Sequence, residues 1–312
     1  MSMPGTIGTD DGVAAGAVAG TVEGAAAPVH ARIAVTGASG QLGGRVAALL
    51  AQTGLGADLR LVVRSAERAP RIDGAEVAVA TYGDLEACTA AFAGVETLLL
   101  VSAGESADRV DQHRTAVTAA AAAGVRHLVY TSFTGASSDA EFTLARDHGA
   151  TEDAIREAAE ATGMRWTLLR DCFYLDVLQP WAGEDRTLRG PAGEGRCAFV
   201  AREDVAQVAA RILAAPSAFA GRVLELTGAE APTLGEVARR LTAATGLEHR
   251  YVDETMEEAR ASRAPYGAPD WEVDAWISTY TAIASGALAA VSGHVAEVLG
   301  REPLRLEDVV RA

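Results

Sequence analysis

The chain has 312 residues, of which 49% are hydrophobic, and its formal net charge at neutral pH is −15. This length suits one large α/β domain, or one domain with a small lobe, and the excess of acids disfavours nucleic acid as a partner. No apolar run approaches the length of a membrane span. The three cysteines lack metal-binding spacing and cannot all pair, so we expect a cytoplasmic protein with no bound metal. The oligomeric state stays open.

The sequence contains no lysine, so all 27 of its lysine-plus-arginine residues are arginine. This absence excludes Schiff-base catalysis, a Walker-type phosphate loop and a catalytic Tyr-x-x-x-Lys pair. An arginine cannot replace lysine as a proton carrier, because its guanidinium group stays charged.

Residues 1–29 are rich in glycine and alanine and predict a flexible extension, and residues 30–312 predict a single domain. In that domain, short apolar runs predict strands at 32–36, 59–63, 76–80, 97–101, 127–131, 165–169 and 223–226. The predicted helices are 43–52, 85–91, 107–123, 149–161, 202–214, 234–245 and 271–290. This alternation predicts a doubly wound, Rossmann-like α/β fold with a parallel sheet. Two less regular segments, 171–196 and 228–312, predict a small substrate lobe over the carboxyl edge of the sheet. The first of them contains a Gly/Pro-rich loop at 183–195.

A glycine-rich turn joins the first predicted strand to the first predicted helix. Gly37 permits the tight turn, Gly40 lets the backbone approach a pyrophosphate, and Gly43 lets the helix lie close to the strand. The free N–H groups of the first helical turn, together with the helix dipole, favour phosphate. The pattern therefore predicts a dinucleotide site that is formed by Gly37, Ser39, Gly40, Gln41, Leu42 and Gly43.

The segment from Thr36 to Gly43 resembles the signature of the short-chain dehydrogenase/reductase superfamily, particularly its extended and atypical branches. At the end of the second strand, an acid favours NAD and an arginine accommodates the 2′-phosphate of NADP. Arg64, helped by Ser65 and Arg68, stands there without a competing acid, so we expect NADPH. The resemblance implies that Asp84 bonds the adenine, although Asp84 also suits the cap of the next helix.

The resemblance narrows to the NmrA-like branch, and to its NAD(P)H:quinone oxidoreductases, over roughly residues 31 to 310. It rests on the stretches 124–133, 142–148, 151–152, 164–174 and 202–206. It implies that the fourth strand, which ends near Ser102, passes beneath the nicotinamide ribose. The serine of classical members is matched by Ser132 or Thr131.

The tyrosine and lysine of the classical proton relay have no match. Alignment on Glu152 places His148 at the lysine position and Leu144 at the tyrosine position, and a shifted register gives Arg146 and Phe142. We expect His148 to bond the nicotinamide ribose, or else to be a surface histidine. No catalytic residue is assigned, and Ser132, His148 and Tyr174 are the candidates.

The absence of this tyrosine favours an acceptor that can take up hydride before it receives a proton. Hydride added to a quinone gives a stabilised hydroquinone anion that water can protonate, whereas an alkoxide benefits from a positioned acid. Aromatic residues at the expected pocket wall suit a flat small-molecule acceptor, or equally a plain core: Phe133, Phe173, Tyr174 and Trp181. Two alternatives remain open, namely a non-catalytic NADP(H)-sensing regulator and a biosynthetic carbonyl, imine or enone reductase.

Overall fold

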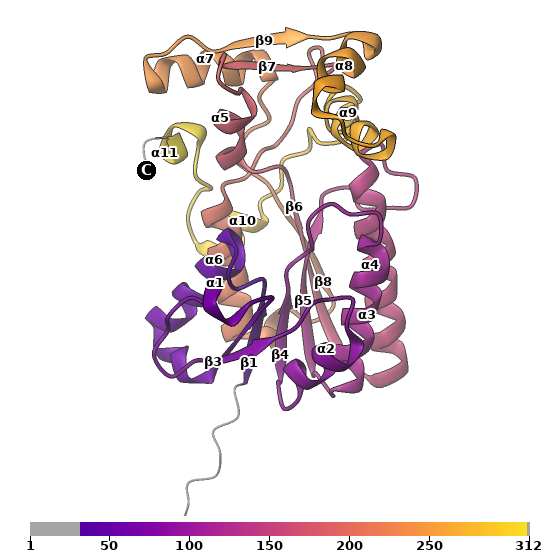
Figure 1. Cartoon of the computed structure of the whole chain (residues 1–312). Helices are drawn as coiled ribbons and strands as arrows, with labels where there is room; N and C mark the ends of the chain where they lie inside the picture. Colours follow the sequence, from indigo (N-terminus) through magenta and orange to yellow (C-terminus); the bar gives the residue numbers. More distant parts are fainter. Residues whose placement is uncertain (1–31, 311–312) are drawn as a thin grey trace, which may run out of the picture.

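The computed structural model describes residues 32–310, so the extension predicted at 1–29 lies outside the described residues. Seven parallel strands form the main sheet in the order β3-β2-β1-β4-β5-β6-β8 (Figure 1). Their bounds are β1 Ile33–Thr36, β2 Leu59–Val63, β3 Glu76–Val79, β4 Thr97–Leu100, β5 His127–Phe133, β6 Arg165–Asp171 and β8 Arg222–Leu226. The predicted doubly wound α/β fold is confirmed.

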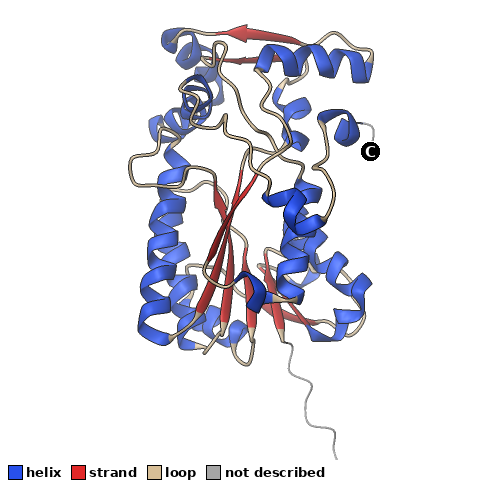
Figure 2. Cartoon of the chain, turned by 180° about the vertical axis from the view of Figure 1, so that it is seen from behind, coloured by secondary structure: helices blue, strands red, loops and turns tan. Residues whose placement is uncertain are grey.

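Helices cover both faces of this sheet. On one face lie α1 Gln41–Leu50 and α6 Arg202–Ala214, and on the other lie α2 Leu85–Phe92, α3 Arg109–Ala122 and α4 Thr143–Thr162 (Figures 1 and 2). Because successive side chains of a strand point to opposite faces, each strand contributes to two separate cores. In β1, Val35 packs with Val46 of α1, whereas the adjacent Ala34 packs on the side of Phe92 from α2.

Two helix predictions are wrong by more than two residues at one end. The sequence predicts α4 from Gly149, whereas the helix starts at Thr143. A Cβ on Gly149 would lie 3.0 Å from the backbone of Ser137, so the glycine allows this helix to pack against the preceding loop. The last long helix, α9 Asp270–Ala284, ends before 290, because Gly286 adopts a positive φ of 78°.

A small lobe covers the carboxyl edge of the main sheet (Figure 1). Its two-stranded parallel sheet pairs β7 Thr187–Gly190 with β9 Arg250–Asp253, and β7 lies within the segment that was predicted as a loop. The lobe helices are α5 Leu178–Trp181, α7 Leu234–Thr245, α8 Met256–Arg263 and α9. Within the segment 228–312, α10 His294–Leu299 instead packs against α6 and β8, and α11 Leu306–Val310 packs against α7.

Among the helices of residues 32–310, none combines the length and the apolar character that crossing a bilayer requires.

Candidate functional site

The crevice for a dinucleotide lies where β1 and β4 are neighbours and the helices that follow them diverge to opposite faces of the sheet. Gly37 has a positive φ of 60°, and its carbonyl accepts a hydrogen bond of 2.8 Å from the N–H of Gly40. Helix α1 starts directly after this turn with no side-chain cap and no acid in its first turn. Its first N–H groups therefore lack intrahelical partners and fit a phosphate group.

The turn has a further neighbour that sequence reasoning missed. Arg202, at the start of α6, donates a hydrogen bond to the Gln41 side chain, so a guanidinium group lies beside the first turn of α1. Arg202 is held there by Asp176, at 3.2 Å. Arg202 and Gln41 are 161 positions apart in the sequence, and nothing local to either segment connects them.

Gly43 is the position in this turn that leaves no room for a side chain. A Cβ there would lie 2.5 Å from the carbonyl oxygen of Gly37 and 2.7 Å from that of Thr36, both of which are backbone atoms. We expect Gly43→Ala to cost about 1–3 kcal/mol of the free energy of unfolding, because α1 must move away from β1. The change should also weaken NADPH binding.

Thermal unfolding and calorimetric titration with NADPH measure both effects. The matched control is Gly293→Ala, where an added Cβ has no neighbour within 4 Å and φ is negative. A Gly43→Ala protein as stable as that control would contradict the close-packing argument.

The segment after β2 carries the residues predicted to hold the 2′-phosphate. Arg64 and Arg68 are exposed, and Arg64 forms no ion pair with any of residues 32–310. Contrary to the expectation of a turn without acids, Glu67 lies here, and the Ser65 hydroxyl donates a hydrogen bond to its carboxylate. This bond lowers the pKa of Glu67.

Asp84 acts as the cap of α2. Its Oδ1 accepts a hydrogen bond of 2.9 Å from the N–H of Ala87, and its side chain is exposed at the end of the third strand. The helix-capping interpretation is therefore confirmed, and the contact with adenine stays a proposal.

At the carboxyl ends of β4 and β5, hydroxyl groups tie the two strands together. The Thr131 hydroxyl accepts a hydrogen bond of 2.8 Å from the N–H of Ser102. The next residue, Ser132, donates a bond of 2.6 Å to Glu152 on α4. Ser132 therefore faces a buried carboxylate, although it also lines the large cavity described below.

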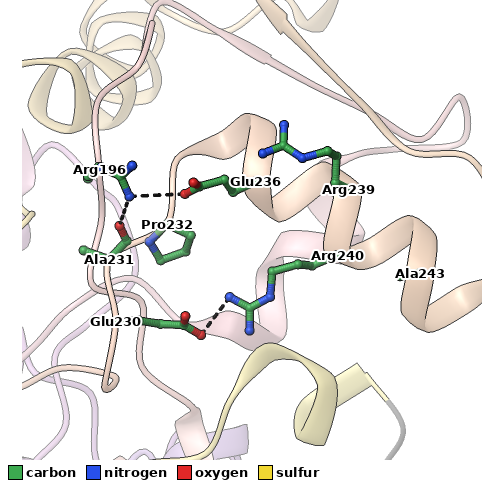
Figure 3. A pocket seen from close by; sticks show the side chains of 8 residues that line it. All are labelled: Arg196, Glu230, Ala231, Pro232, Glu236, Arg239, Arg240 and Ala243. Carbon is green, nitrogen blue, oxygen red and sulfur yellow. Dashed lines mark hydrogen bonds and ion pairs between the residues drawn. The ribbon is translucent and has the colours of Figure 1, made fainter.

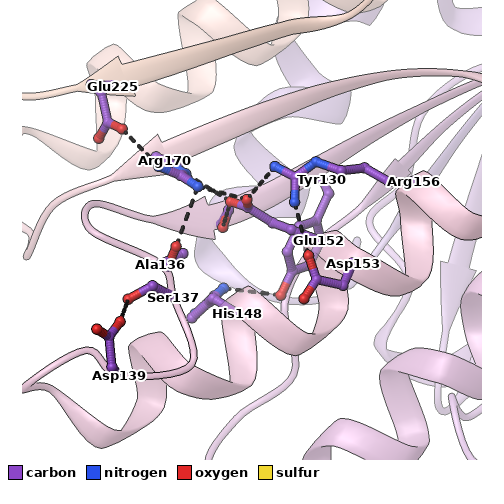
Figure 4. A network of polar contacts seen from close by, with 11 residues as sticks. Tyr130, Ala136, Ser137, Asp139, His148, Glu152, Asp153, Arg156, Arg170 and Glu225 are labelled. Carbon is purple, nitrogen blue, oxygen red and sulfur yellow. Dashed lines mark hydrogen bonds and ion pairs between the residues drawn. The ribbon is translucent and has the colours of Figure 1, made fainter.

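Glu152 is the centre of a buried ionic network (Figure 4). Its side chain is 1% exposed and is bonded by Arg170 at 2.7 Å and by Arg156 at 2.8 Å. Burial alone would raise the pKa of Glu152, but hydrogen bonds from Arg170 and Ser132 hold it below its usual value. At neutral pH Glu152 is therefore a charged anchor between α4, β5 and β6, and it is not a proton donor.

His148 is fully engaged within the protein. Its Nε2 accepts a hydrogen bond of 2.9 Å from Arg109, and its Nδ1 lies 2.9 Å from the Tyr130 hydroxyl. Since the guanidinium can only donate, Nε2 carries no proton, and Nδ1–H is the donor toward Tyr130. Burial, with Arg109 and His113 nearby, lowers the pKa of His148 well below its usual value. A hydrogen bond to ribose would have to replace one of these bonds, and the expectation of a surface histidine is wrong.

Replacing His148 with Ala should lower the free energy of unfolding by about 1–3 kcal/mol, because a buried arginine N–H and a buried tyrosine hydroxyl lose their partners. The matched variant is His148→Gln, whose amide oxygen can accept from Arg109 and whose NH₂ can donate to Tyr130. We expect Gln to recover most of the stability in urea unfolding. Equal losses in the two variants would show that packing, and not hydrogen bonding, gives this residue its role.

A cavity of about 870 Å³ opens between the sheet edge and the small lobe. The four residues predicted for the acceptor pocket all line this cavity: Phe133, Phe173, Tyr174 and Trp181. Tyr174 is also a candidate catalytic residue, and the other two candidates, Ser132 and His148, line the cavity as well. The ring centroids of Phe133 and Phe173 are 4.9 Å apart, and those of Phe173 and Trp181 are 5.7 Å apart. The wall suits a flat aromatic molecule that stacks on these rings.

Several cavity residues were missed by sequence reasoning. Further aromatic side chains line the cavity, among them Phe142 and, from α9, Trp276 and Tyr280. No local sequence pattern marks them as cavity residues. Asp171 also lines the cavity, as the last residue of β6. The sequence signal that could have identified Asp171 as a cavity residue is its position three residues before Tyr174 in the Asp-Cys-Phe-Tyr segment.

A second hollow of about 510 Å³ lies beside α7 (Figure 3). Its charged wall is largely paired within itself, with Arg196 on Glu236 at 3.2 Å and Arg240 on Glu230 at 2.7 Å. Its lining residues all come from the segment 196–243, and none stands at the ends of β4, β5 or β6. The aromatic cavity is therefore the candidate for the acceptor.

Comparison with known proteins places this geometry in a family. The model of the NAD(P)H-binding family matches residues 37–216. The chain is 34% identical to quinone oxidoreductase 2 of Escherichia coli over 89% of this chain and 97% of that protein. It is 31% identical to an NmrA-like family domain-containing oxidoreductase of Aspergillus flavus, over 90% of this chain and 94% of that one.

Solved structures agree with this placement. The Escherichia coli quinone oxidoreductase 2 in complex with NADPH superposes with a TM-score of 0.80, at 33% identity, and covers 89% of this chain and 98% of that one. The triphenylmethane reductase of Citrobacter sp. in complex with NADP(H) also has a TM-score of 0.80, at 30% identity, over 89% and 99% of the two chains. The chain therefore belongs to the NAD(P)H-binding family, in its NmrA-like branch.

Proposed function

We propose that this protein, an NAD(P)H-dependent reductase, transfers hydride from NADPH to a flat quinone-like or conjugated acceptor. The observation that carries the proposal is the aromatic cavity, which lies at the carboxyl ends of β4, β5 and β6 and holds Ser102, Phe133 and Asp171 in its wall. In a doubly wound sheet these strand ends border the ligand crevice, so an acceptor in the cavity lies beside the reactive end of the dinucleotide.

The residues proposed for the cofactor follow the same edge. The turn from Gly37 to Gly43 would hold the pyrophosphate, and Arg64, with Ser65 and Arg68, would hold the 2′-phosphate. Asp84 is proposed for the adenine, and Ser102 and Thr131 for the nicotinamide ribose. When bound, NADPH supplies the hydride, and this chain binds and orients the two reactants and excludes water.

The absence of lysine supports an acceptor that takes hydride without a Tyr–Lys relay. A quinone or a similar conjugated acceptor delocalises the negative charge that hydride addition creates, whereas a simple ketone concentrates it on one oxygen. Of the two relatives with solved structures, one is named as an NADPH-dependent quinone oxidoreductase and the other as a triphenylmethane reductase, and the first of these names agrees with this acceptor class.

An anaerobic screen of NADPH oxidation across quinones, enones, imines and ketones tests the proposal. We expect turnover with quinones and conjugated acceptors, and a primary isotope effect when the transferred hydrogen of NADPH is deuterium. Tight NADPH binding without oxidation by any acceptor would overturn the proposal and favour a cofactor-sensing role. Turnover confined to imines or simple ketones would favour a biosynthetic reductase.

We propose a reducing compartment such as the cytoplasm. Cys172 and Cys197 allow a test, because both are buried and their sulfurs are 3.5 Å apart. The proposed localisation predicts that freshly purified protein contains these two thiols in reduced form.

A further inference from the structure

A single carboxyl group lies in the wall of the aromatic cavity at the end of the central strands. Asp171 pairs in register with Phe133 across β6 and β5, and both line the cavity. Asp171 is only 6% exposed. The Tyr174 hydroxyl donates a hydrogen bond to its Oδ2, and Tyr174 lines the same cavity.

Among residues 32–310, no guanidinium group forms an ion pair with the carboxyl of Asp171. Arg202 instead stacks on Tyr174, with its guanidinium 5.1 Å from the centroid of that ring. The titratable and charged groups that interact with Asp171 or Tyr174 are Tyr130, Asp176 and Arg202. The remaining ones in the cavity wall are Glu105, His148, Cys172, Glu184, Asp185, Arg189, Arg263, Tyr266 and Tyr280. Burial raises the pKa of Asp171 to about 7, against the lowering effect of the Tyr174 hydroxyl and of its own backbone.

His148, Ser132 and Glu152 do not compete for the role of proton donor. Both ring nitrogens of His148 are bonded within the protein, and the proton of Ser132 is directed at Glu152. Glu152 is held in its charged form by two arginines. Four carboxyl groups of the described residues line this cavity. Glu105, Glu184 and Asp185 are exposed, whereas Asp171 is buried and stands at the end of β6.

We propose that Asp171 is the catalytic acid that protonates the reduced acceptor, with Tyr174 as the residue that positions its carboxyl. The inference rests on the proposed hydride transfer to a quinone-like acceptor. Hydride addition leaves the acceptor as a hydroquinone anion. Water protonates such an anion in free solution, but in this cavity the aromatic rings shield it from bulk water, so a donor in the wall speeds the step. The O–H bond of Asp171 breaks, its proton forms an O–H bond on that anion, and the carboxylate then takes a proton from water at the cavity mouth.

The first test compares acceptors that differ in their need for a proton. Asp171→Asn should lower the turnover number with a small quinone about a hundredfold. The turnover number with a triarylmethane cation should fall far less, because that product is neutral without a proton. Equal losses with both acceptors would overturn the proposal and make Asp171 structural. If the unmodified protein oxidises NADPH with neither acceptor, it is the proposed function that fails.

The second test follows the carboxyl group directly, without turnover. Difference infrared spectroscopy of the protein across pH 5–9 should show a protonated carboxyl band that titrates near neutrality and is missing in Asp171→Asn. In Tyr174→Phe the midpoint should move to higher pH, since the phenol no longer stabilises the carboxylate. Quinone turnover should decline at high pH as Asp171 loses its proton, because activity needs the protonated form. In Tyr174→Phe the midpoint of this decline should also move to higher pH.

The control is Asp153→Asn, which removes an exposed carboxylate that pairs with Arg156 on α4 and does not line the cavity. In this control, the midpoint of the infrared titration and the midpoint of the pH dependence of quinone turnover should equal those of the unmodified protein. A band that titrates unchanged in Asp171→Asn, or a midpoint of quinone turnover that Tyr174→Phe does not move, would contradict the assignment.

Discussion

Replacement of Glu152 with Gln is expected to lower the free energy of unfolding by about 3–5 kcal/mol, because it removes the buried negative charge that compensates Arg170. The Glu152 side chain is 1% exposed, and its oxygens are bonded by Arg170, Arg156 and Ser132. In the variant, Arg170 keeps only the contact of 3.3 Å with Glu225 as an ion pair. Urea unfolding at neutral pH measures the loss.

The same carboxyl group makes the effect depend on pH. Its pKa is lower in the folded protein than in the unfolded chain. The stabilisation is therefore fully present above the unfolded value, about 4.3, and is lost as pH falls through the folded pKa. The difference in stability between the unmodified protein and Glu152→Gln should shrink below about pH 4.

Asp153→Asn is the matched control, because Asp153 is the next residue on α4 and also pairs with Arg156. Its side chain is 71% exposed, so its loss should cost less than about 1 kcal/mol. If the two variants lose similar amounts, the network of Figure 4 does not stabilise the fold through its buried charge.

Arg64→Ala is expected to weaken NADPH binding by roughly 1.5–3 kcal/mol, or about 10- to 150-fold, and to leave NADH nearly unchanged. The guanidinium is exposed at the end of β2 and can form a charge-assisted, bidentate pair with a 2′-phosphate. Calorimetric titration of both cofactors against the unmodified protein and the variant gives the two affinities.

Arg71→Ala controls for the general loss of positive charge, since Arg71 is exposed and lies further along the same segment. This control should weaken both cofactors slightly or not at all. Equal affinity of the unmodified protein for NADPH and NADH would discard Arg64 as the 2′-phosphate site.

Short local signals determined the dinucleotide half of the protein. The bounds of β2 and α6 match their predictions, because each is an uninterrupted apolar or amphipathic run, and the same holds for α7 in the lobe. The glycines of the 37–43 turn could also be predicted, since backbone conformation and close approach restrict those positions to one residue type. The absence of lysine excluded whole reaction classes from composition alone.

Only the tertiary structure decided where α4 begins and what His148 does. Phe142 precedes that helix and cannot cap it, and the cap comes from Ser278 of α9, which accepts from the N–H of Thr143 at 3.1 Å. Because Ser278 is 135 residues away in the sequence, the residues around Thr143 do not indicate that the helix starts there. The earlier start places His148 inside the helix and against the sheet, where Arg109 and Tyr130 bind both of its nitrogens.

The acceptor cavity likewise depends on contacts between distant segments. Its wall joins the ends of β4, β5 and β6 to α9 and to the lobe, which the pairing of β7 with β9 holds together. Sequence alone marks aromatic side chains but cannot distinguish a ring in the core from a ring at a cavity. Burial of Asp171 beside Tyr174 is a property of that enclosure, because the desolvation that changes a carboxyl group's pKa exists only once the chain has folded around it.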